Sequence, residues 1–515
     1  MKFEESTLPP VALRRLVFSS VLWQTASALY VYLVRLAALV ILARLLSPRD
    51  FGLVASATII IGLGNLFGHL GIGNALLQKA SIQEKDVYTA FWLSTLSGLL
   101  LSILVFLTAP LFARLLGSTE VIPLIRVLTV TFVLVAVSNV SRAQLQRDLR
   151  FGALSILQAA SYTAGYLVVG FLMARGGYGH WALVGAHLTE VVVSSVGAFL
   201  WAPQRIRCVF DMEAARQMLS FGVMQTLAVL LNYAATQFDR VLVARWLGMT
   251  PLGWYTRASY LPTFAASLVD AAVGRVGFAA GSRVQNEEYS FRAGTLQSTT
   301  LLLLLLAPAA ILCALLAREI VSALLGPKWM PVVPLLQVFS VGIVADSLSR
   351  LAYYLLLAKG KVVTLVALQA AYVVCVVACT LAGLPYGAIG VAAGVVTASF
   401  VNLFLHLAAL SRAITLSLRD MRGVLLPSLA GSAMTALLTV PIVTTLRALQ
   451  LPGVFTLFGT LFILGWLLVL LRKPILRVLQ PIAGEVLGEV GHSARNLAHS
   501  LAASWRFSRQ GGGTT

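Results

Sequence analysis

About fourteen apolar stretches, each bounded by charged residues, Gly or Pro, divide this sequence as far as residue 471. A helix that crosses a bilayer needs about 20 apolar residues, and most of the stretches have that length. In lipid, a segment must satisfy its own backbone groups, which leaves helices or a closed barrel. The pattern predicts helices near 18–43, 51–73, 88–109, 121–141, 153–174, 180–201, 217–244, 253–281, 296–317, 331–357, 362–384, 388–411, 424–446 and 453–471.

Composition supports the same fold class. Apolar residues make up 59% of the chain and charged residues 11%, whereas an average soluble domain is roughly half apolar and about a quarter charged. We therefore expect an all-α polytopic membrane protein with about fourteen transmembrane helices and almost no soluble domain.

The basic residues predict the orientation. A net charge of +19 would suggest nucleic-acid binding in a soluble chain, but Lys and Arg also gather on the cytoplasmic side of membrane proteins. With a cytoplasmic N-terminus, roughly 24 of them fall in inner segments and roughly 8 in outer loops. We expect both termini in the cytoplasm and no nucleic-acid partner.

An internal repeat predicts two lobes. QTASALYVYLVRLAALVILARLLSPRDFG, residues 24–52, aligns without a gap with QTLAVLLNYAATQFDRVLVARWLGMTPLG, residues 225–253, and about nine of the 29 positions are identical. Two later echoes follow in the same order: LLG before VIPLIRV and before VVPLLQV, then YGHWALVG and YGAIGVAAG. Chance similarity among Leu, Val and Ala is the alternative, but Gln-Thr, Ala-Arg, Pro and Tyr-Gly recur at fixed offsets. A unit of six helices has therefore been duplicated, and the copies are parallel because six is even.

The repeat sets the expected domains. They are a cytoplasmic N-terminal tail (1–13), an N-lobe of six helices (14–202), a basic cytoplasmic linker (203–215), a C-lobe of six helices (216–411), an appended helix pair (412–471) and a cytoplasmic tail (472–515) with an amphipathic pattern and a disordered end.

Charged residues inside the apolar stretches are the candidates for function. Each costs about 2.5–3.5 kcal/mol at the centre of a membrane helix, and such residues usually face a bundle interior or a wet cavity. Asp239 and Arg240 point about 100° apart on a helix, so they cannot simply neutralise each other. The repeat places Arg35 near the counterpart of Arg240, across a shared cleft. The set is Arg35, Asp239, Arg240, Arg257, Asp270, Arg275, Asp346 and Arg350.

These charges have two readings. Arginines facing one cleft suit a diphosphate, because a guanidinium stays charged and donates paired hydrogen bonds to phosphate oxygens. The alternative is a set of salt bridges that only fix packing. We favour substrate binding in the central cavity for Arg35, Asp239, Arg240 and Arg257. Asp346 and Arg350 are four residues apart on one helix, which favours a packing pair; with Arg275 they are also candidates for ion coupling or for a cavity charge. Asp270 is a candidate for H+ or Na+ coupling.

No pattern indicates an enzyme. The sequence has no zinc-spaced His and Glu pair, no paired carboxylates and no phosphate-cradling glycine loop, so we expect no catalytic residue, metal site or cofactor. His187 and Glu190 are three residues apart, which is more often a polar patch between helices than part of a metal site.

Several segments together resemble a known family. They are ARLLSPRDFG, GHLGIGNALLQK, QFDRVLVARWLG, GWYTRASYLPT and LLGPKWMPVVPLLQVFSV. In this order they are similar to bacterial polysaccharide flippases of the Wzx and PST type, whose MATE-like (MOP) superfamily also holds MATE drug exporters and the lipid II flippase. The similarity covers residues 14 to about 471.

The resemblance implies how such a protein works. Two six-helix lobes surround a central cavity and move undecaprenyl-diphosphate-linked oligosaccharide across the bacterial inner membrane by alternating access, for exopolysaccharide or O-antigen synthesis. Asp239 and Arg240 match the Asp-Arg pair of the family, and Arg35 matches a cationic cavity position. Membrane lipids, a polysaccharide polymerase and export machinery are the implied partners. Two alternatives remain open: a MATE-like drug or metabolite antiporter, which would favour an acidic cavity, and a membrane polysaccharide polymerase, which would need larger loops.

Overall fold

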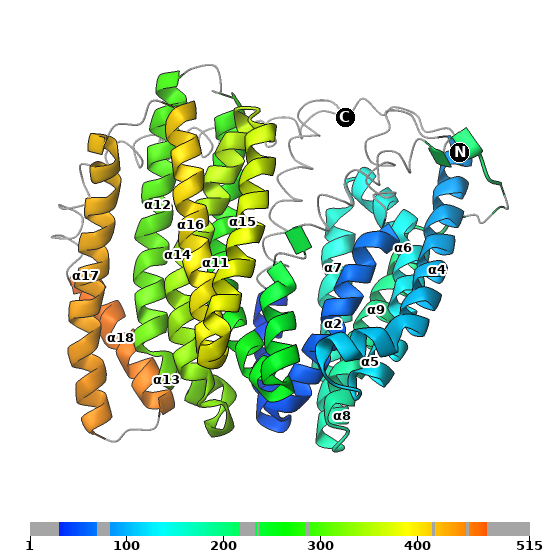
Figure 1. The fold of residues 1–515 in the computed structure, drawn as a ribbon, viewed down its shortest axis with the longest axis horizontal. Coiled ribbons are helices and arrows are strands. Elements are labelled where there is room, and N and C mark those ends of the chain that lie inside the picture. Colours follow the sequence, from blue (N-terminus) through cyan, green and yellow to red (C-terminus); the bar gives the residue numbers. More distant parts are fainter. Residues whose placement is uncertain are drawn as a thin grey trace, which may run out of the picture. The chain divides into compact units, whose positions relative to one another are not determined.

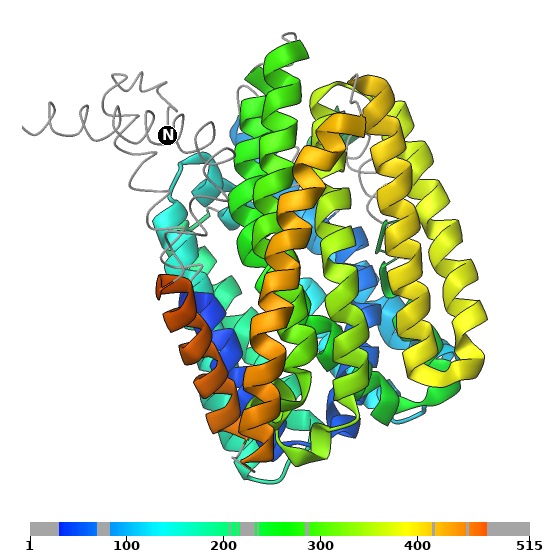
Figure 2. The same cartoon turned by 90° about the vertical axis from the view of Figure 1, so that its left-hand side faces the viewer.

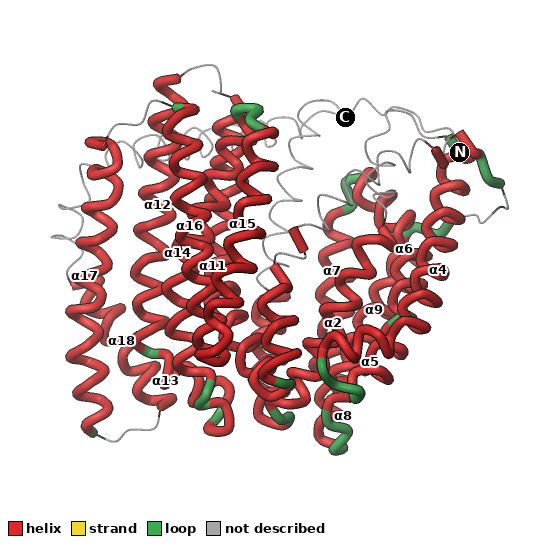
Figure 3. The backbone as a smooth tube through the Cα atoms, viewed as in Figure 1, coloured by secondary structure: helices red, strands yellow, loops and turns green. Residues whose placement is uncertain are grey.

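The computed structural model describes residues 30–69, 83–204, 207, 209–213, 215–216, 232–233, 236–283, 288–414, 418–449 and 453–470. Within these ranges the regular elements are helices and no strand occurs (Figures 1 and 3). The main helices are α2 (Pro48–His69), α4 (Glu84–Leu116), α5 (Val121–Leu128), α6 (Val130–Arg147), α7 (Phe151–Tyr162), α8 (Gly170–Arg175), α9 (His180–Trp201), α11 (Met249–Arg283), α12 (Glu288–Leu315), α13 (Ala317–Ile320), α14 (Val332–Ala358), α15 (Val362–Gly383), α16 (Gly387–Ala413), α17 (Leu418–Ala448) and α18 (Gly453–Leu470).

Among the described residues, eight helical segments are long and apolar enough to cross a membrane. One of them, Val362–Ala413, comprises α15 and α16. The predicted all-α membrane fold is thereby confirmed, while the expected number of about fourteen spans stays a prediction. The segments are Glu84–Leu116, Val121–Arg147, Phe151–Arg175, His180–Trp201, Gly294–Leu315, Val332–Ala358, Val362–Ala413 and Val424–Ala448.

The chain packs into two compact units. Unit 1 comprises Met1–Thr263, Val321–Gly342 and Val366–Asn402, and unit 2 comprises Phe264–Ile320, Ile343–Leu365 and Leu403–Thr515. These units are groups of closely packed segments, so they do not test the duplicated lobes, which stay a prediction. The predicted tails, 1–13 and 472–515, lie outside the described residues.

Unit 2 is built on α12 and α17, which pack along each other; α18 packs against α17 (Figure 2). Arg447, near the end of α17, donates to both carboxylate oxygens of Glu319 in α13, over 2.7 and 2.9 Å. A two-pronged guanidinium–carboxylate pair of this kind fixes orientation as well as distance. It holds the end of α17 against α13.

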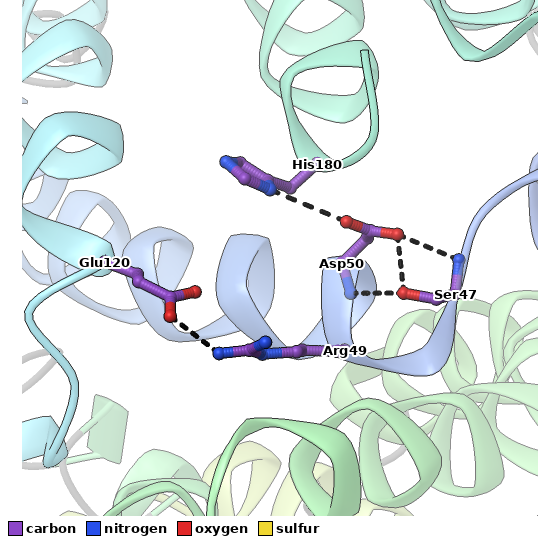
Figure 4. Close-up of polar contacts among 5 residues, drawn as sticks. All are labelled: Ser47, Arg49, Asp50, Glu120 and His180. Carbon is purple, nitrogen blue, oxygen red and sulfur yellow. Dashed lines mark hydrogen bonds and ion pairs between the residues drawn. The ribbon is translucent and has the colours of Figure 1, made fainter. Parts of the chain in front are cut away.

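In unit 1 the segment SPRDFG starts α2. The backbone N–H and the hydroxyl of Ser47 donate to Asp50 Oδ2 over 2.9 and 2.6 Å, and the Asp50 N–H points back at Ser47 Oγ (Figure 4). This is a capping box with Pro48 at the first helical position, where its missing N–H costs nothing. The other oxygen of Asp50 lies 3.5 Å from His180 Nδ1, at the first residue of α9. Ser47, Pro48 and Asp50 thus fix both where α2 begins and where it lies relative to α9.

Two glycines allow α2 and α11 to cross at backbone contact. Gly52 is the fifth residue of α2, and a Cβ there would overlap the carbonyl oxygen of Met249, the first residue of α11. Gly253 is the fifth residue of α11, and a Cβ there would overlap the carbonyl oxygen of Pro48, the first residue of α2. The repeat aligns Pro48 with Met249 and Gly52 with Gly253. Gly52 and Gly253, at equivalent positions of the aligned segments, therefore each contact the first residue of the other's helix.

A second pair of contacts involves Arg44 and Arg245, shortly before the first residues of α2 and α11. Arg44 Nη2 donates to the carbonyl oxygen of Ala323 over 2.5 Å. Arg245, which the repeat aligns with Arg44, lies against Gly117, where a Cβ would be 3.1 Å from its carbonyl oxygen. Gly117 and Ala323 belong to the two segments that carry the repeated LLG. Arg44 and Arg245 thus each lie against the LLG-bearing segment from the other half of the sequence.

Candidate functional site

A cavity of about 420 Å³ lies within unit 1. It is bounded by helical segment 30–45, the first turns of α2, the end of α7, the first half of α9, the first half of α11, and by Tyr233, Gln237 and Arg240. Its polar and aromatic lining residues are Arg35, Phe51, Thr58, Tyr162, Tyr166, His187, Tyr233, Gln237, Arg240, Thr256, Arg257, Ser259, Tyr260 and Thr263.

Arg35 enters the cavity beside a pair of tyrosines. Its guanidinium lies 5.3 Å from the centre of the Tyr162 ring, within the distance at which a cation is attracted to an aromatic face. The Tyr162 ring in turn stacks on Tyr166, with 4.4 Å between centres and 17° between planes. Tyr166 lies in a π-helical stretch, Thr163–Val169, which continues α7; single π-turns of this kind often occur at functional sites. The guanidinium of Arg35 is therefore held by aromatic rings.

Arg257, on the third turn of α11, is held in the same way. Its guanidinium lies 4.9 Å from the centre of Phe51 and 5.5 Å from that of Tyr260. Phe51 is buried and meets Trp329 edge to face at 5.2 Å. The fully buried Trp329 donates from its indole N–H to the carbonyl oxygen of Ala43 over 2.9 Å. Phe51 is thus fixed between Trp329 and the guanidinium of Arg257.

Arg240 lines the cavity, whereas its neighbour Asp239 does not. Arg240 Nη1 donates to the side-chain oxygen of Gln237 over 2.9 Å, and Gln237 also lines the cavity. Asp239 is buried, and the hydroxyl of Tyr255 donates to its Oδ2 over 2.6 Å. The two neighbours therefore have separate partners, in agreement with the angle of about 100° between successive helical residues.

The cavity is electropositive. Arg35, Arg240 and Arg257 line it, and none of the described lining residues is Asp or Glu. The Nε atoms of Arg35 and Arg257 are buried without a hydrogen-bond partner. Fixed cations in a cleft of low dielectric attract anions strongly. The arrangement suits an anionic group that accepts several hydrogen bonds.

The structure places the predicted site residues in three groups. Arg35, Arg240 and Arg257 share the cavity, while Asp239 packs behind it. Asp270 and Arg275 lie on α11, where their side chains are outside the described residues. Asp346 and Arg350 lie on α14 in unit 2, where Arg350 donates to Ser347 Oγ over 2.8 Å. The binding role of each of these residues stays a prediction.

Sequence reasoning missed most of the neutral lining. Tyr233, which is close in sequence to Asp239 and Arg240, lines the cavity. Its hydroxyl donates to the carbonyl oxygen of Ile59 over 2.8 Å. Tyr162, Tyr166 and Tyr260 were not anticipated, because a tyrosine in a membrane helix is ordinary packing until its partner is known. One signal was present: Tyr162 and Tyr166 are four residues apart, which places them on one helix face. His187, expected in a polar patch, lines the cavity and contacts Glu190 at 3.3 Å.

Comparison with protein families decides the family. Residues 41–334, more than half of the chain, match the model of a family described as polysaccharide biosynthesis protein. The chain belongs to this polysaccharide biosynthesis family. The resemblance inferred from the order of the sequence segments is therefore confirmed.

Curated relatives in this family come from different bacteria. The teichuronic acid biosynthesis protein TuaB of Bacillus subtilis (strain 168) is 25% identical over 67% of this chain and 72% of its own length. The lipopolysaccharide biosynthesis protein WzxC of Escherichia coli (strain K12) is 24% identical over 68% of this chain and 72% of its own length. The succinoglycan biosynthesis transport protein ExoT of Rhizobium meliloti (strain 1021) is 26% identical over 64% and 66%.

Solved structures show that this family member has the expected MATE-like fold. The lipid II flippase MurJ, in an inward closed conformation, superposes with a TM-score of 0.70 at 15% identity, over 88% of this chain and 100% of that one. An inward-facing multidrug resistance MATE transporter of the MOP superfamily superposes with a TM-score of 0.59 at 16% identity, over 74% of this chain and 95% of that one.

Proposed function

We propose that this protein is a flippase that moves undecaprenyl-diphosphate-linked oligosaccharide from the cytoplasmic to the periplasmic leaflet of the bacterial inner membrane by alternating access. The observation that carries the proposal is the cavity with three arginines and no carboxylate among its described lining residues. Family membership and relatives named for polysaccharide synthesis and transport support it.

The proposed substrate fits the physical problem. A diphosphate and its sugars cannot enter hydrocarbon without a prohibitive loss of hydration, whereas the apolar lipid tail already lies in hydrocarbon. Arg35, Arg240 and Arg257 would bind the diphosphate, because guanidinium groups present paired donors to phosphate oxygens. Hydroxyl groups of Ser259 and Thr263 on the same wall would bind sugar hydroxyls. The protein carries out transport rather than catalysis.

A drug or metabolite antiporter of the same fold is the other candidate from the sequence. A cavity for organic cations needs carboxylates, and the described lining has none. The fold shared with MATE transporters does not decide between the two, since one fold serves many substrates. The charge of the lining favours the anionic lipid.

The test compares single arginine variants in cells. We expect Arg240→Ala and Arg35→Ala to lower polysaccharide export by about tenfold or more, because each removes charge-assisted hydrogen bonds of about 1.5–3 kcal/mol. Lipid-linked oligosaccharide should accumulate on the inner leaflet, and its analysis would identify the glycan. Arg126→Ala is the matched control, because Arg126 is exposed and lies over Phe106 at 5.0 Å, outside the cavity lining. Unaltered export in both cavity variants at normal expression would remove these residues from the site.

Coupling and partners belong to the same proposal. We propose that an H+ or Na+ gradient drives the cycle, with Asp270 as the candidate ion site, and that a polymerase and export machinery receive the product outside. Transport into vesicles under imposed gradients of H+ or Na+ would identify the ion. Transport that needs neither gradient would contradict the coupling.

A further inference from the structure

The three cavity arginines share an unusual kind of support. Buried cations in proteins are normally paired with carboxylates, which offset part of the cost of losing water. Here Arg35 lies on Tyr162, Arg257 lies on Phe51 and Tyr260, and Arg240 is bonded to the neutral Gln237. The nearest carboxylate in sequence, Asp239, is bonded to Tyr255. Each guanidinium is therefore oriented by neutral groups.

Neutral support has a consequence for anion binding. A carboxylate partner would orient an arginine but would also occupy its donors and cancel its charge. An aromatic ring attracts the guanidinium through its negative face and leaves the N–H groups at the edge of the ion free. No protein acceptor takes the buried Nε atoms of Arg35 and Arg257. Neutral support therefore cancels less of each guanidinium's charge than a carboxylate partner would.

We propose that Tyr162 and Phe51 are positioning residues, whose rings hold Arg35 and Arg257 in the cavity wall in the orientation that binds the diphosphate. This inference rests on the proposed function. Both rings are themselves fixed: Tyr162 stacks on Tyr166, and Phe51 meets the buried Trp329. The rings act through the arginines and need not touch the lipid.

A double-mutant cycle tests this claim. Binding of undecaprenyl diphosphate to the purified full-length protein in detergent is measured for Tyr162→Leu, Arg35→Ala and the double variant. We expect Tyr162→Leu to weaken binding roughly three- to thirtyfold, which corresponds to the usual strength of a cation–π contact. The same change should have less than about a twofold effect once Arg35 is Ala, because the ring then has nothing to hold. Phe51→Leu should behave likewise with Arg257→Ala.

Two further variants separate the ring from the fold. Tyr162→Phe keeps the aromatic face and should bind as the wild type does. Replacing Tyr162 by a trifluorinated phenylalanine keeps the shape but withdraws electron density from the face, so binding should fall as it does in Tyr162→Leu. Binding by the fluorinated variant can be measured even if Tyr162→Leu fails to fold. In the Arg257→Ala background, Tyr162→Leu should keep its full effect, because Tyr162 acts on Arg35.

The outcomes distinguish this inference from the proposed function. Equal losses from Tyr162→Leu with and without Arg35 would mean that the ring contacts the lipid directly, which overturns the positioning role alone. Normal binding by the fluorinated variant would also overturn it. Absence of undecaprenyl diphosphate binding by the wild type would overturn the proposed function together with the positioning role.

Discussion

Asp239 and Arg240 are adjacent in the sequence but have different environments. Arg240 lines the cavity, whereas Asp239 is buried against the fully buried Tyr255. Asp239 Oδ1 has no hydrogen-bond partner, so the hydroxyl of Tyr255 is its principal neutral support. The carboxylate thus packs behind the cavity, while the guanidinium faces into it.

Removing that hydroxyl should therefore cost stability. We expect Tyr255→Phe to lower the free energy of unfolding by about 1–3 kcal/mol, the usual cost of leaving a buried polar group unpaired. Thermal unfolding in detergent measures the change. In an Asp239→Asn background, Tyr255→Phe should lower the free energy of unfolding by clearly less, because the buried group that it leaves unpaired is no longer charged. Equal costs in both backgrounds would show that the hydroxyl does not support the carboxylate.

The sequence revealed the charged part of the site but not its neutral part. Arg35, Arg240 and Arg257 stand out because a charge in an apolar stretch needs a reason. The sequence could not show that Asp239 faces away from the cavity, since that depends on where Tyr255 packs. Phe51 and Tyr162 carry no such signal, because aromatic residues are common in membrane helices whatever they contact. Their role becomes visible only when the guanidinium above each ring is known.

At the scale of elements, apolar length predicted the helices well. The stretch expected near 180–201 is α9, His180–Trp201, and that near 453–471 is α18, Gly453–Leu470. The stretch near 121–141 lies in the candidate span Val121–Arg147, which the single residue Thr129 divides into α5 and α6. Val121, Leu124, Ile125 and Leu128 of α5 are fully buried, because α5 packs against α2, α4 and α9. Apolarity alone does not distinguish burial in protein from burial in lipid.

The crossing of α2 and α11 gives a prediction at this scale. Gly52→Ala and Gly253→Ala should each weaken folding or transport, since the new methyl group overlaps a backbone carbonyl that cannot move aside without parting the helices. Gly152→Ala is the matched control: nothing lies within 4 Å of a Cβ there, and alanine is the better helix former by about 1 kcal/mol. Unfolding temperature and export of the three variants measure this. Normal behaviour of Gly52→Ala and Gly253→Ala would contradict the close crossing.

At the scale of the whole molecule, the repeat and the cavity differ in symmetry. The contacts of Gly52 with Met249 and of Gly253 with Pro48 join equivalent positions of the two aligned segments. The cavity is not symmetric: Arg240 and Arg257 align with Leu39 and Ser56 of the first copy. The aligned positions are alike at the crossing and differ in the lining of the cavity. Similarity of fold alone does not identify the substrate.

Transport by the purified protein in vesicles tests directly whether the three cavity arginines carry the lipid-linked oligosaccharide across the membrane. A fluorescent undecaprenyl-diphosphate-linked oligosaccharide is placed in one leaflet, and its appearance in the other is followed with an impermeant quencher. We expect transfer by the wild type and by Arg126→Ala. The triple variant with Arg35, Arg240 and Arg257 changed to Ala should show no transfer above that of protein-free vesicles. Transfer by the triple variant at the wild-type rate, or none by the wild type under any imposed ion gradient, would contradict the account.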